Sequence, residues 1–531
     1  MTTRYGIAIR IHVWRRDGKK QVSADGSGRQ RYLPRWSSNA THRLVTGLVG
    51  LWSLILCWLG VNWAFHPRTF LIQDEIGDLG WPLRVSYPSL LHLFPRVVLF
   101  DRPFGFAFLR VLYEQFGFDY RPHLVAMLAL HFINLIFVFV LLRRLGTRLP
   151  LSLTGLGAFG GLWVTAAAAT YLGGGEHDVL CTLFMLGSTL AILSERPWLW
   201  YLSALSFLLS LRSKEWGIVI PVFLTALVIV RLAPRFNLRR LLIEAGKRLW
   251  AHYLILLVYG SIYLSLAAKS HAKLASSAPY HVDLGPSTIY QSLVFYTALI
   301  FAADGQPWRW ILFAGLVLIC VYALIRRRGL ILFGAFAYVL TLLPVSMIPN
   351  QRSQYYAYGP QIFLILTLCL FLEDILDLTS KTQRQRWTVG VCVAAAILTM
   401  VSFIRASNYY RDRIHWTWWV RGANWKSAQD AEVQLSKIGP GSHVYVDSGN
   451  ETPWLFAPGP CVFLQVWRND YSIQCFLQQP GVDLRAQYDR DTAEKYFVQY
   501  ERGGALTTRL SSPRLEAAAP PAPVPPPKTR R

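Results

Sequence analysis

The residues with the clearest capacity for chemistry are carboxylates in a polar stretch that follows the first apolar segment. Gln73, Asp74 and Glu75 stand together there, and Asp78 follows shortly after. A carboxylate at a boundary between water and an apolar medium is partly desolvated, and it then becomes basic enough to take the proton of a hydroxyl group. The same pair also fits a solvated acidic turn or the negative charges that favour a helix N-terminus. Both interpretations remain open.

A second polar stretch joins three glycines to three ionisable residues. Gly173–Gly175 leads directly into Glu176, His177 and Asp178. Glycines let the backbone approach a ligand closely, and the two acidic residues add further carboxylates. A divalent cation held by these three side chains is conceivable, but no second cluster of ligand residues supports one. We therefore expect no metal site and no cofactor.

Two cations interrupt a hairpin between apolar runs. Arg212 and Lys214 stand close to Trp216 in the sequence. This pattern is typical of charges that snorkel from a membrane span to the interface, beside an aromatic belt residue. They also suit the phosphate of an anionic lipid headgroup, which Lys214 would meet as a point charge.

A third polar stretch combines one cation with several tyrosines. Arg352 precedes Tyr355, Tyr356 and Tyr358. Tyrosines at this kind of position anchor spans at the interface, but their ring faces also stack on pyranose rings and their hydroxyls bond to sugars.

Polar residues also enter the second apolar run. Arg102 and His123 precede it, and His131 and Asn134 lie within it, three residues apart and hence on one helix face. Polar groups in a span face protein or a water-filled cavity, so hydrogen bonds between helices compete with a substrate-binding role. For His131 and Asn134 we favour the hydrogen bonds.

The composition identifies the elements that must position these side chains. Of the 531 residues, 53% are hydrophobic and only 16% are charged, yet the formal net charge is +24. Long apolar runs exclude a disordered, coiled-coil or nucleic-acid-binding chain and indicate an all-α polytopic membrane protein. Eleven transmembrane helices are predicted near residues 45–65, 124–142, 151–170, 179–194, 198–211, 217–231, 249–268, 308–325, 330–346, 357–373 and 387–404.

The distribution of Lys and Arg predicts the orientation of these spans. With residues 1–44 in the cytoplasm, the short inner loops carry sixteen basic residues and the short outer loops carry five, as the positive-inside rule requires. A twelfth span at residues 287–303 would place Arg326–Arg328 outside. We therefore interpret that run as a re-entrant or interfacial helix on the outer face.

The chain is then divided into four parts. A basic cytoplasmic N-terminus (1–44) precedes a transmembrane catalytic domain (45–404) with a long first outer loop (66–123). Residues 405–510 are expected to form a small extracytoplasmic α/β domain, with strands at 442–446 and 462–466. Residues 511–531 are a proline-rich disordered tail. Cys461 and Cys475 could pair if this part of the chain faces an oxidising compartment.

Five motifs in this order resemble the GT-C superfamily of polyprenyl-phosphate-dependent glycosyltransferases, especially the branch related to protein O-mannosyltransferases. The likeness runs from about residue 70 to 365. Its motifs are the acidic Gln73–Glu75; Asp101–Gly105 with Tyr120–His123 and His131; Asp178; Leu209–Pro221; and Gln354–Pro360. In the last motif, Gln354 and Tyr355 replace the usual acid and arginine, which leaves Arg352 as the substitute cation.

The resemblance implies an inverting glycosyltransferase acting on the extracytoplasmic side. Its implied partners are a polyprenyl-phosphate-linked sugar, the lipid bilayer and an unknown acceptor hydroxyl on a protein, glycan or lipid, with no nucleic acid. It implies three sets of site residues: catalytic Asp74, Glu75 and Asp178; phosphate-binding Lys214, Arg212 and Arg352; and substrate-binding Arg102, His123, His131, Glu176, Tyr356 and Tyr358.

Two other classes of multispanning protein remain open. One is a lipid or polysaccharide transporter, although the sequence shows no convincing inverted repeat. The other is a ligase or polymerase of the O-antigen type. The expected location is the bacterial inner membrane, with the active site facing the periplasm.

Overall fold

The computed structural model describes residues 71, 73–97, 101–233, 237–269, 280–301, 307–412, 435–447, 462–477, 484–500 and 506–510, with a few isolated residues besides. The predicted N-terminus 1–44, the tail 511–531 and nearly all of the predicted span 45–65 lie outside these residues. Cys475 is disulfide-bonded and its partner also lies outside them. Cys461 is not among the described residues, so its pairing with Cys475 stays a prediction.

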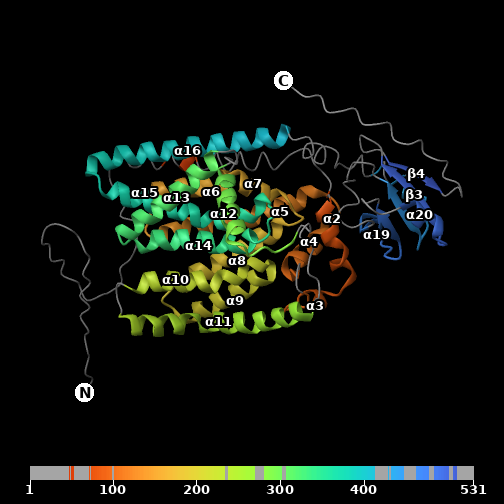
Figure 1. Cartoon of the computed structure of the whole chain (residues 1–531), viewed down its shortest axis with the longest axis horizontal. Coiled ribbons are helices and arrows are strands. Elements are labelled where there is room, and N and C mark those ends of the chain that lie inside the picture. The colour runs from red at the N-terminus through yellow and green to blue at the C-terminus, as the bar shows by residue number, and fades with distance from the viewer. Residues whose placement is uncertain are drawn as a thin grey trace, which may run out of the picture.

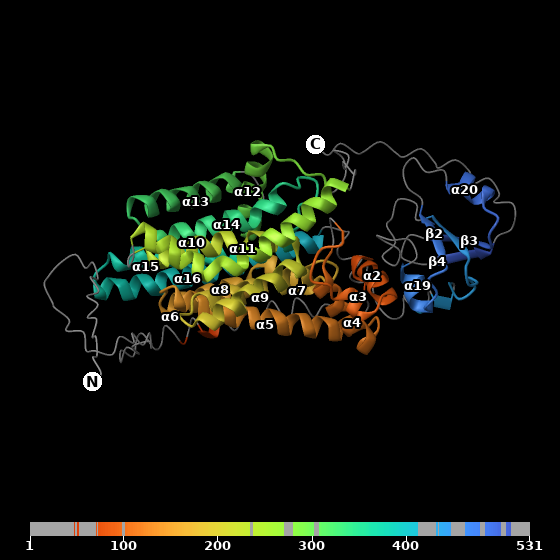
Figure 2. The ribbon, with the colours of Figure 1, turned by 90° about the horizontal axis from the view of Figure 1, so that it is seen from below.

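The described chain is mostly helical, and its long helices run side by side in a bundle (Figure 1, Figure 2). Large apolar side chains cover the outside of this bundle, among them Leu257, Leu318 and Ile325, which are 66%, 68% and 76% exposed. An apolar exterior of this extent suits a lipid environment. The helices are α5 (Tyr120–Arg144), α6 (Leu149–Gly161), α7 (Trp163–Thr170), α8 (Gly175–Ile192), α9 (Pro197–Ser213), α10 (Ile220–Leu232), α11 (Leu238–Lys269), α12 (Pro286–Ile300), α13 (Trp308–Ile325), α14 (Gly329–Ser346), α15 (Pro360–Asp377) and α16 (Lys381–Asp412).

Five of the described helical segments are long and apolar enough to cross a membrane. They are Tyr120–Arg144, Glu215–Leu232, Leu238–Leu266, Trp308–Ile325 and Gly329–Ser346. The bent pair α6 and α7 makes a sixth if it is one span. A multi-pass membrane protein is compatible with these helices, and the count of eleven spans stays a prediction.

Four other predicted spans coincide with helices that fall short of this standard: α8, α9, α15 and α16. Helix α9 has 17 residues, and α15 carries Glu373, Asp374 and Asp377 near its end. The first turn of helix α8 contains the polar residues Glu176, His177 and Asp178. The predicted interfacial run at 287–303 is helix α12, which has 15 residues.

The first predicted outer loop folds into short helices at one end of the bundle, beside the C-terminal sheet (Figure 1). These are α2 (Gln73–Gly80), a 3-10 turn (Pro82–Arg84), α3 (Tyr87–Leu90) and α4 (Pro103–Phe116). Helix α4 begins with a proline in its first turn, where no backbone N–H is required. It packs against α2, α8 and α9 and so joins the loop to the bundle.

The C-terminal part contains a four-stranded mixed sheet with strand order β2-β1-β3-β4. Strands β2 and β3 both pair with β1 in parallel, and β4 pairs with β3 antiparallel. Parallel neighbours need crossover connections, which α19 and α20 lie within. The elements are β1 (His443–Asp447), α19 (Val462–Arg468), β2 (Gln474–Leu477), α20 (Leu484–Arg490), β3 (Lys495–Tyr500) and β4 (Leu506–Leu510).

Alternation along β1 explains why helices cover both faces of this sheet. Val444 belongs to the same buried cluster as Phe463 of α19. Tyr445, the next residue, packs with Tyr488 of α20 instead. Successive side chains of a strand point to opposite faces, so each face acquires its own apolar layer.

The structure confirms the strand predicted at 442–446 and corrects the one predicted at 462–466, which is helix α19. The run reads as a strand because it is apolar and short, and periodicity cannot distinguish a short apolar strand from a helix. Burial of Phe463, Leu464 and Val466 shows a helical apolar face. That face belongs to the main core, and α19 packs on α2.

Candidate functional site

Ionisable side chains from four separate segments contact one another in pairs and clusters. Two of these segments, α2 and α4, lie at one end of the bundle (Figure 1, Figure 2). The segments are α2, the start of α4, the start of α8, and the turn between α9 and the following 3-10 helix (Glu215–Val219). Helices α2 and α8 each contact α4, and so does α9. These packing contacts bring residues from position 74 to position 216 into one site.

Lys214 and Asp178 form a buried ion pair at the centre of this site. The Lys214 Nζ atom donates to Asp178 Oδ2 over 2.5 Å, and Trp216 Nε1 donates to Asp178 Oδ1 over 3.0 Å. The side chains of Lys214 and Asp178 are 3% and 1% exposed. Removing two charges from water is costly. Each charged side chain is therefore stabilised by its attraction to the other and by its hydrogen bonds.

Aromatic rings cover the remaining side of the Lys214 ammonium. Its Nζ atom lies 4.7 Å from the ring centre of Tyr356 and 5.3 Å from that of Tyr355. Cation–π contacts of this kind stabilise a desolvated ammonium further. Lys214, the predicted phosphate-binding lysine, is therefore enclosed by protein. Tyr356, another predicted site residue, is in contact with it.

The two arginines of the site are also paired with carboxylates. Arg102 donates from Nε and Nη2 to Glu215, with contacts of 2.9 to 3.2 Å. Arg212 is fully buried, and its Nη2 atom lies 3.1 Å from Asp101 Oδ1. The Arg102 side chain is 13% exposed, so it is the most accessible of the site's three cations.

Asp74 lies in the first turn of α2 and is half-buried. The Tyr171 hydroxyl donates a hydrogen bond to its Oδ2 atom. Burial raises the pKa of the Asp74 carboxyl above its usual range, and the Tyr171 hydrogen bond offsets part of that rise. Burial and the neighbouring Asp74 charge raise the pKa of Tyr171 well above its usual value, so it stays a neutral donor.

Glu75, the near alternative to Asp74, is fully buried, and its Oε1 atom accepts from the Leu172 N–H over 3.1 Å. Both carboxylates thus hold the segment before α8. Gly173 makes this contact close, because a Cβ atom there would lie 2.5 Å from the Asp74 Cβ. The glycine therefore admits α2 rather than a ligand. Of the two carboxylates, only Asp74 retains exposure.

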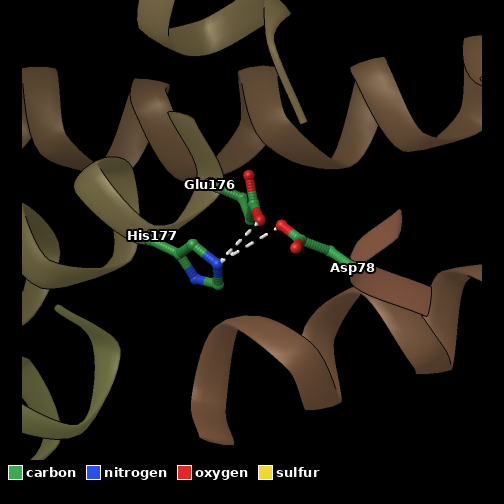
Figure 3. Close-up of side chains that lie close together, drawn as sticks. All are labelled: Asp78, Glu176 and His177. Carbon is green, nitrogen blue, oxygen red and sulfur yellow. Dashed lines mark ion pairs between the residues drawn. The ribbon is translucent and has the colours of Figure 1, made fainter. Parts of the chain in front are cut away.

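Asp78, Glu176 and His177 form a second cluster beside Asp74 (Figure 3). The His177 Nε2 atom lies 3.2 Å from Glu176 Oε1 and 3.8 Å from Asp78 Oδ2. Each residue offers one ligand atom, and these three atoms lie within 4.8 Å of one another. The group could hold a metal ion.

The membership of this cluster differs from the set that the sequence offered. Residues two apart on a helix point in nearly opposite directions, so Glu176 and Asp178 diverge. Asp178 pairs with Lys214, and Asp78 of α2 takes its place. Burial raises the pKa of Asp78 to about 7, with Arg102 and Lys214 opposing and Asp74 reinforcing the rise.

The structure places His131 and Tyr358 inside the bundle, away from these pairs. His131 Nδ1 lies 2.8 Å from the Tyr358 hydroxyl, and Asn134 donates to that hydroxyl and to the Val179 carbonyl, both over 3.1 Å. These are the hydrogen bonds between helices that the sequence analysis favoured for His131 and Asn134. They join α5 to α8 and to the segment before α15.

Two other predicted residues lie at separate positions. The fully buried His123 Nδ1 atom lies 2.7 Å from the Asp119 carbonyl at the start of α5. The Arg352 guanidinium lies over the Phe295 ring of α12, 5.5 Å from its centre. Neither has a described contact with Asp74 or Lys214.

Several residues of the site were not among the predicted set: Asp78, Tyr171, Glu215, Trp216 and Tyr355. Two of them carried a usable signal. Asp78 follows Asp74 by four residues, which places both on one face of a helix. Glu215 directly follows Lys214, so it lies inside the predicted motif.

Comparison with known proteins identifies no family model and no curated protein that matches this chain. The arrangement of the site's own residues therefore carries the functional argument.

Proposed function

We propose that the chain is an inverting glycosyltransferase that moves a sugar from a polyprenyl-phosphate donor to an acceptor hydroxyl. One observation carries the proposal. A half-buried carboxylate, Asp74, lies on α2 at one end of an apolar bundle, one helical turn from Asp78, which interacts electrostatically with the cations Arg102 and Lys214. A base beside cations at a lipid boundary is what cleavage of a lipid phosphodiester requires.

In the proposed reaction, Asp74 takes the proton of the acceptor hydroxyl. The acceptor oxygen forms a bond with the anomeric carbon of the sugar, and the bond from that carbon to the phosphate oxygen breaks. The products are a glycosylated acceptor with inverted configuration, free polyprenyl phosphate and a protonated Asp74 carboxyl. Attack and departure on opposite faces of the sugar cause the inversion.

Negative charge develops on the departing phosphate, and preorganised cations stabilise it. We assign the nearest contact to Arg102, because its guanidinium is partly exposed whereas Lys214 is 3% exposed and Arg212 is fully buried. The Arg102 Nε and Nη2 atoms donate to Glu215, so the phosphate would meet the guanidinium as a delocalised positive charge. Lys214, which is buried and paired with Asp178, adds positive charge to the site without contacting the phosphate directly.

The proposed location is the bacterial inner membrane, with the site facing the periplasm. The excess of Lys and Arg in the predicted inner loops supports this orientation. The proposed partners are the lipid-linked sugar, the bilayer and an acceptor that carries a hydroxyl group.

Reconstitution into liposomes with a panel of polyprenyl-phosphate sugars tests the reaction. We expect one donor to be consumed with release of polyprenyl monophosphate and transfer of its sugar. Release of polyprenyl diphosphate would instead indicate a ligase or polymerase of the O-antigen type. Movement of an intact lipid-linked sugar across the bilayer, with no transfer, would indicate a transporter and contradict the proposal.

The pH dependence of transfer follows from the environment of Asp74. Its pKa is raised by burial, and a general base works only when deprotonated. We expect full activity above that pKa and a fall of about tenfold per pH unit below it. The fall should begin at a higher pH than a solvent-exposed aspartate would give. The measurement is kcat/KM for the donor from about pH 4 to about pH 9.

Tyr171→Phe provides a check on the assignment. This change removes the hydrogen bond that lowers the pKa of Asp74, so the acid limb should move to higher pH. A limb that stays in place, or moves to lower pH, would argue that another group controls it.

A further inference from the structure

The cluster of Asp78, Glu176 and His177 has features that transfer chemistry at Asp74 does not explain. Its three ligand atoms converge from two elements, α2 and the first turn of α8 (Figure 3). One member of the cluster, Asp78, lies on the same helix as Asp74 and one turn further along α2.

Polar atoms in this cluster are buried without hydrogen-bond partners. Glu176 is fully buried and His177 is 1% exposed. Among the described residues, Glu176 Oε1 and both ring nitrogens of His177 have no hydrogen-bond partner. A buried polar atom that is left without a hydrogen-bond partner destabilises the fold. Of these atoms, Glu176 Oε1 and His177 Nε2 lie 3.2 Å apart, and together they indicate a bound species that contacts both.

The described Lys and Arg side chains form no ion pair with the two carboxylates of the cluster. Within the described residues, the ion pairs of Asp78 and Glu176 involve only His177, whose charge depends on protonation. The nearby cations are engaged elsewhere, because Lys214 pairs with Asp178 and Arg102 pairs with Glu215. In the deprotonated form that ligates a metal ion, two carboxylates and a neutral imidazole carry a charge of −2, which a divalent cation balances.

We propose that Asp78, Glu176 and His177 bind one divalent transition-metal ion, Zn²⁺ or Mn²⁺. An imidazole nitrogen with two carboxylates is a mixed ligand set that suits Zn²⁺, and its carboxylates also suit Mn²⁺. Mg²⁺ and Ca²⁺ prefer oxygen ligands alone. Binding of the ion depends on these three side chains and not on glycosyl transfer.

The packing of α4 determines which ring nitrogen faces the metal. Gly105 lies against the other edge of the imidazole, and a Cβ atom there would be 1.8 Å from His177 Nδ1. The Nε2 atom is the one that faces Glu176 and Asp78. A metal ion bound through Nε2 therefore connects α2 to α8 and holds Asp74 one turn away. In this position it acts as a positioning element for the base.

Metal content of the full-length chain tests the site directly. The protein, purified in detergent without a polyhistidine tag, is stripped with a chelator and titrated with Zn²⁺, Mn²⁺ or Mg²⁺. We expect about one tightly bound Zn²⁺ or Mn²⁺ per chain by elemental analysis, and much weaker binding of Mg²⁺. No bound ion, or binding of Mg²⁺ as tight as that of Zn²⁺ and Mn²⁺, would overturn the assignment.

Variants show whether these residues are the ligands. We expect Asp78→Asn, Glu176→Gln and His177→Gln each to weaken binding by about 100-fold or more. Gly105→Ala leaves all three ligands in place but should also reduce binding, because its methyl group displaces the imidazole. Glu114→Gln is the matched control, since Glu114 is an exposed carboxylate on α4 that pairs with Arg110.

The outcomes of this test separate the metal site from the proposed reaction. Unchanged binding in the three ligand variants, with elution volume and thermal midpoint like those of the unaltered chain, would overturn the site. If a ligand variant does not fold, Gly105→Ala and the titration of the unaltered chain still decide. Stoichiometric metal binding without sugar transfer would support the site while contradicting the glycosyltransferase proposal.

Discussion

Asp74→Asn is expected to lower the rate of sugar transfer by about 100- to 10,000-fold, because the amide cannot accept the proton of the acceptor hydroxyl. The replacement keeps the size of the side chain and an oxygen that accepts from Tyr171. The fold should therefore persist while the base is lost. The measurement is the initial rate of transfer in liposomes at matched amounts of inserted protein.

Two comparisons make this result specific. Glu75→Gln keeps an oxygen for the Leu172 N–H, and its effect should be at least about tenfold smaller than that of Asp74→Asn if Asp74 is the base. Asp119→Asn is the isosteric control. Asp119 caps α5 by accepting from the Arg121 N–H, and asparagine caps helices equally well. Normal transfer by a correctly inserted Asp74→Asn chain would eliminate the proposed mechanism.

Lys214→Met is expected to lower the free energy of unfolding by about 3 to 5 kcal/mol, because it leaves Asp178 as a buried charge without its partner. Both side chains are at most 3% exposed, so water cannot replace the lost ammonium. The measurement is the apparent thermal midpoint in detergent, followed by tryptophan fluorescence. We expect a decrease of about 5 °C or more.

An exposed ion pair supplies the control for this loss. Lys247 is 60% exposed and pairs with Glu244 on α11 over 2.9 Å. Surface pairs contribute about 0 to 1 kcal/mol, so Lys247→Met should hardly change the midpoint. The double variant Lys214→Met with Asp178→Asn removes both buried charges and should recover much of the loss. A double variant as unstable as the single one would show that the charge of Asp178 is not the cause.

The sequence indicated well where the chain is apolar and which motifs carry charge. The run at 124–142 became α5, and Glu215–Leu232 contains the run at 217–231, because long apolar stretches fold as helices whatever their neighbours are. The motif around Lys214 was also informative, since three charged residues within four positions between apolar runs are costly unless they are paired. The structure gives each of its charged members a carboxylate or cation partner.

The sequence could not show which carboxylate meets which cation. Asp78 and Asp178 are both acidic residues near a predicted outer face. Only the packing of α2 and α8 on α4 makes Asp78 a neighbour of His177, and only the packing of α8 on α9 makes Asp178 a neighbour of Lys214. Short apolar segments were ambiguous for a related reason. Residues 462–466 have the composition of a strand, and their helical form is set by the surfaces of α2 and the sheet.

The contact between α19 and α2 has a consequence for the C-terminal part of the chain. Phe118, just after α4, stacks on Trp467 with ring centres 5.3 Å apart, and Arg84 donates to Gln465 over 2.5 Å. Helix α2, which carries Asp74, is therefore wedged between the bundle and a segment nearly four hundred residues further along the chain. Truncation after α16 would remove the segment that packs against the outer side of α2, so we expect the C-terminal fold to support the helix that carries the proposed base.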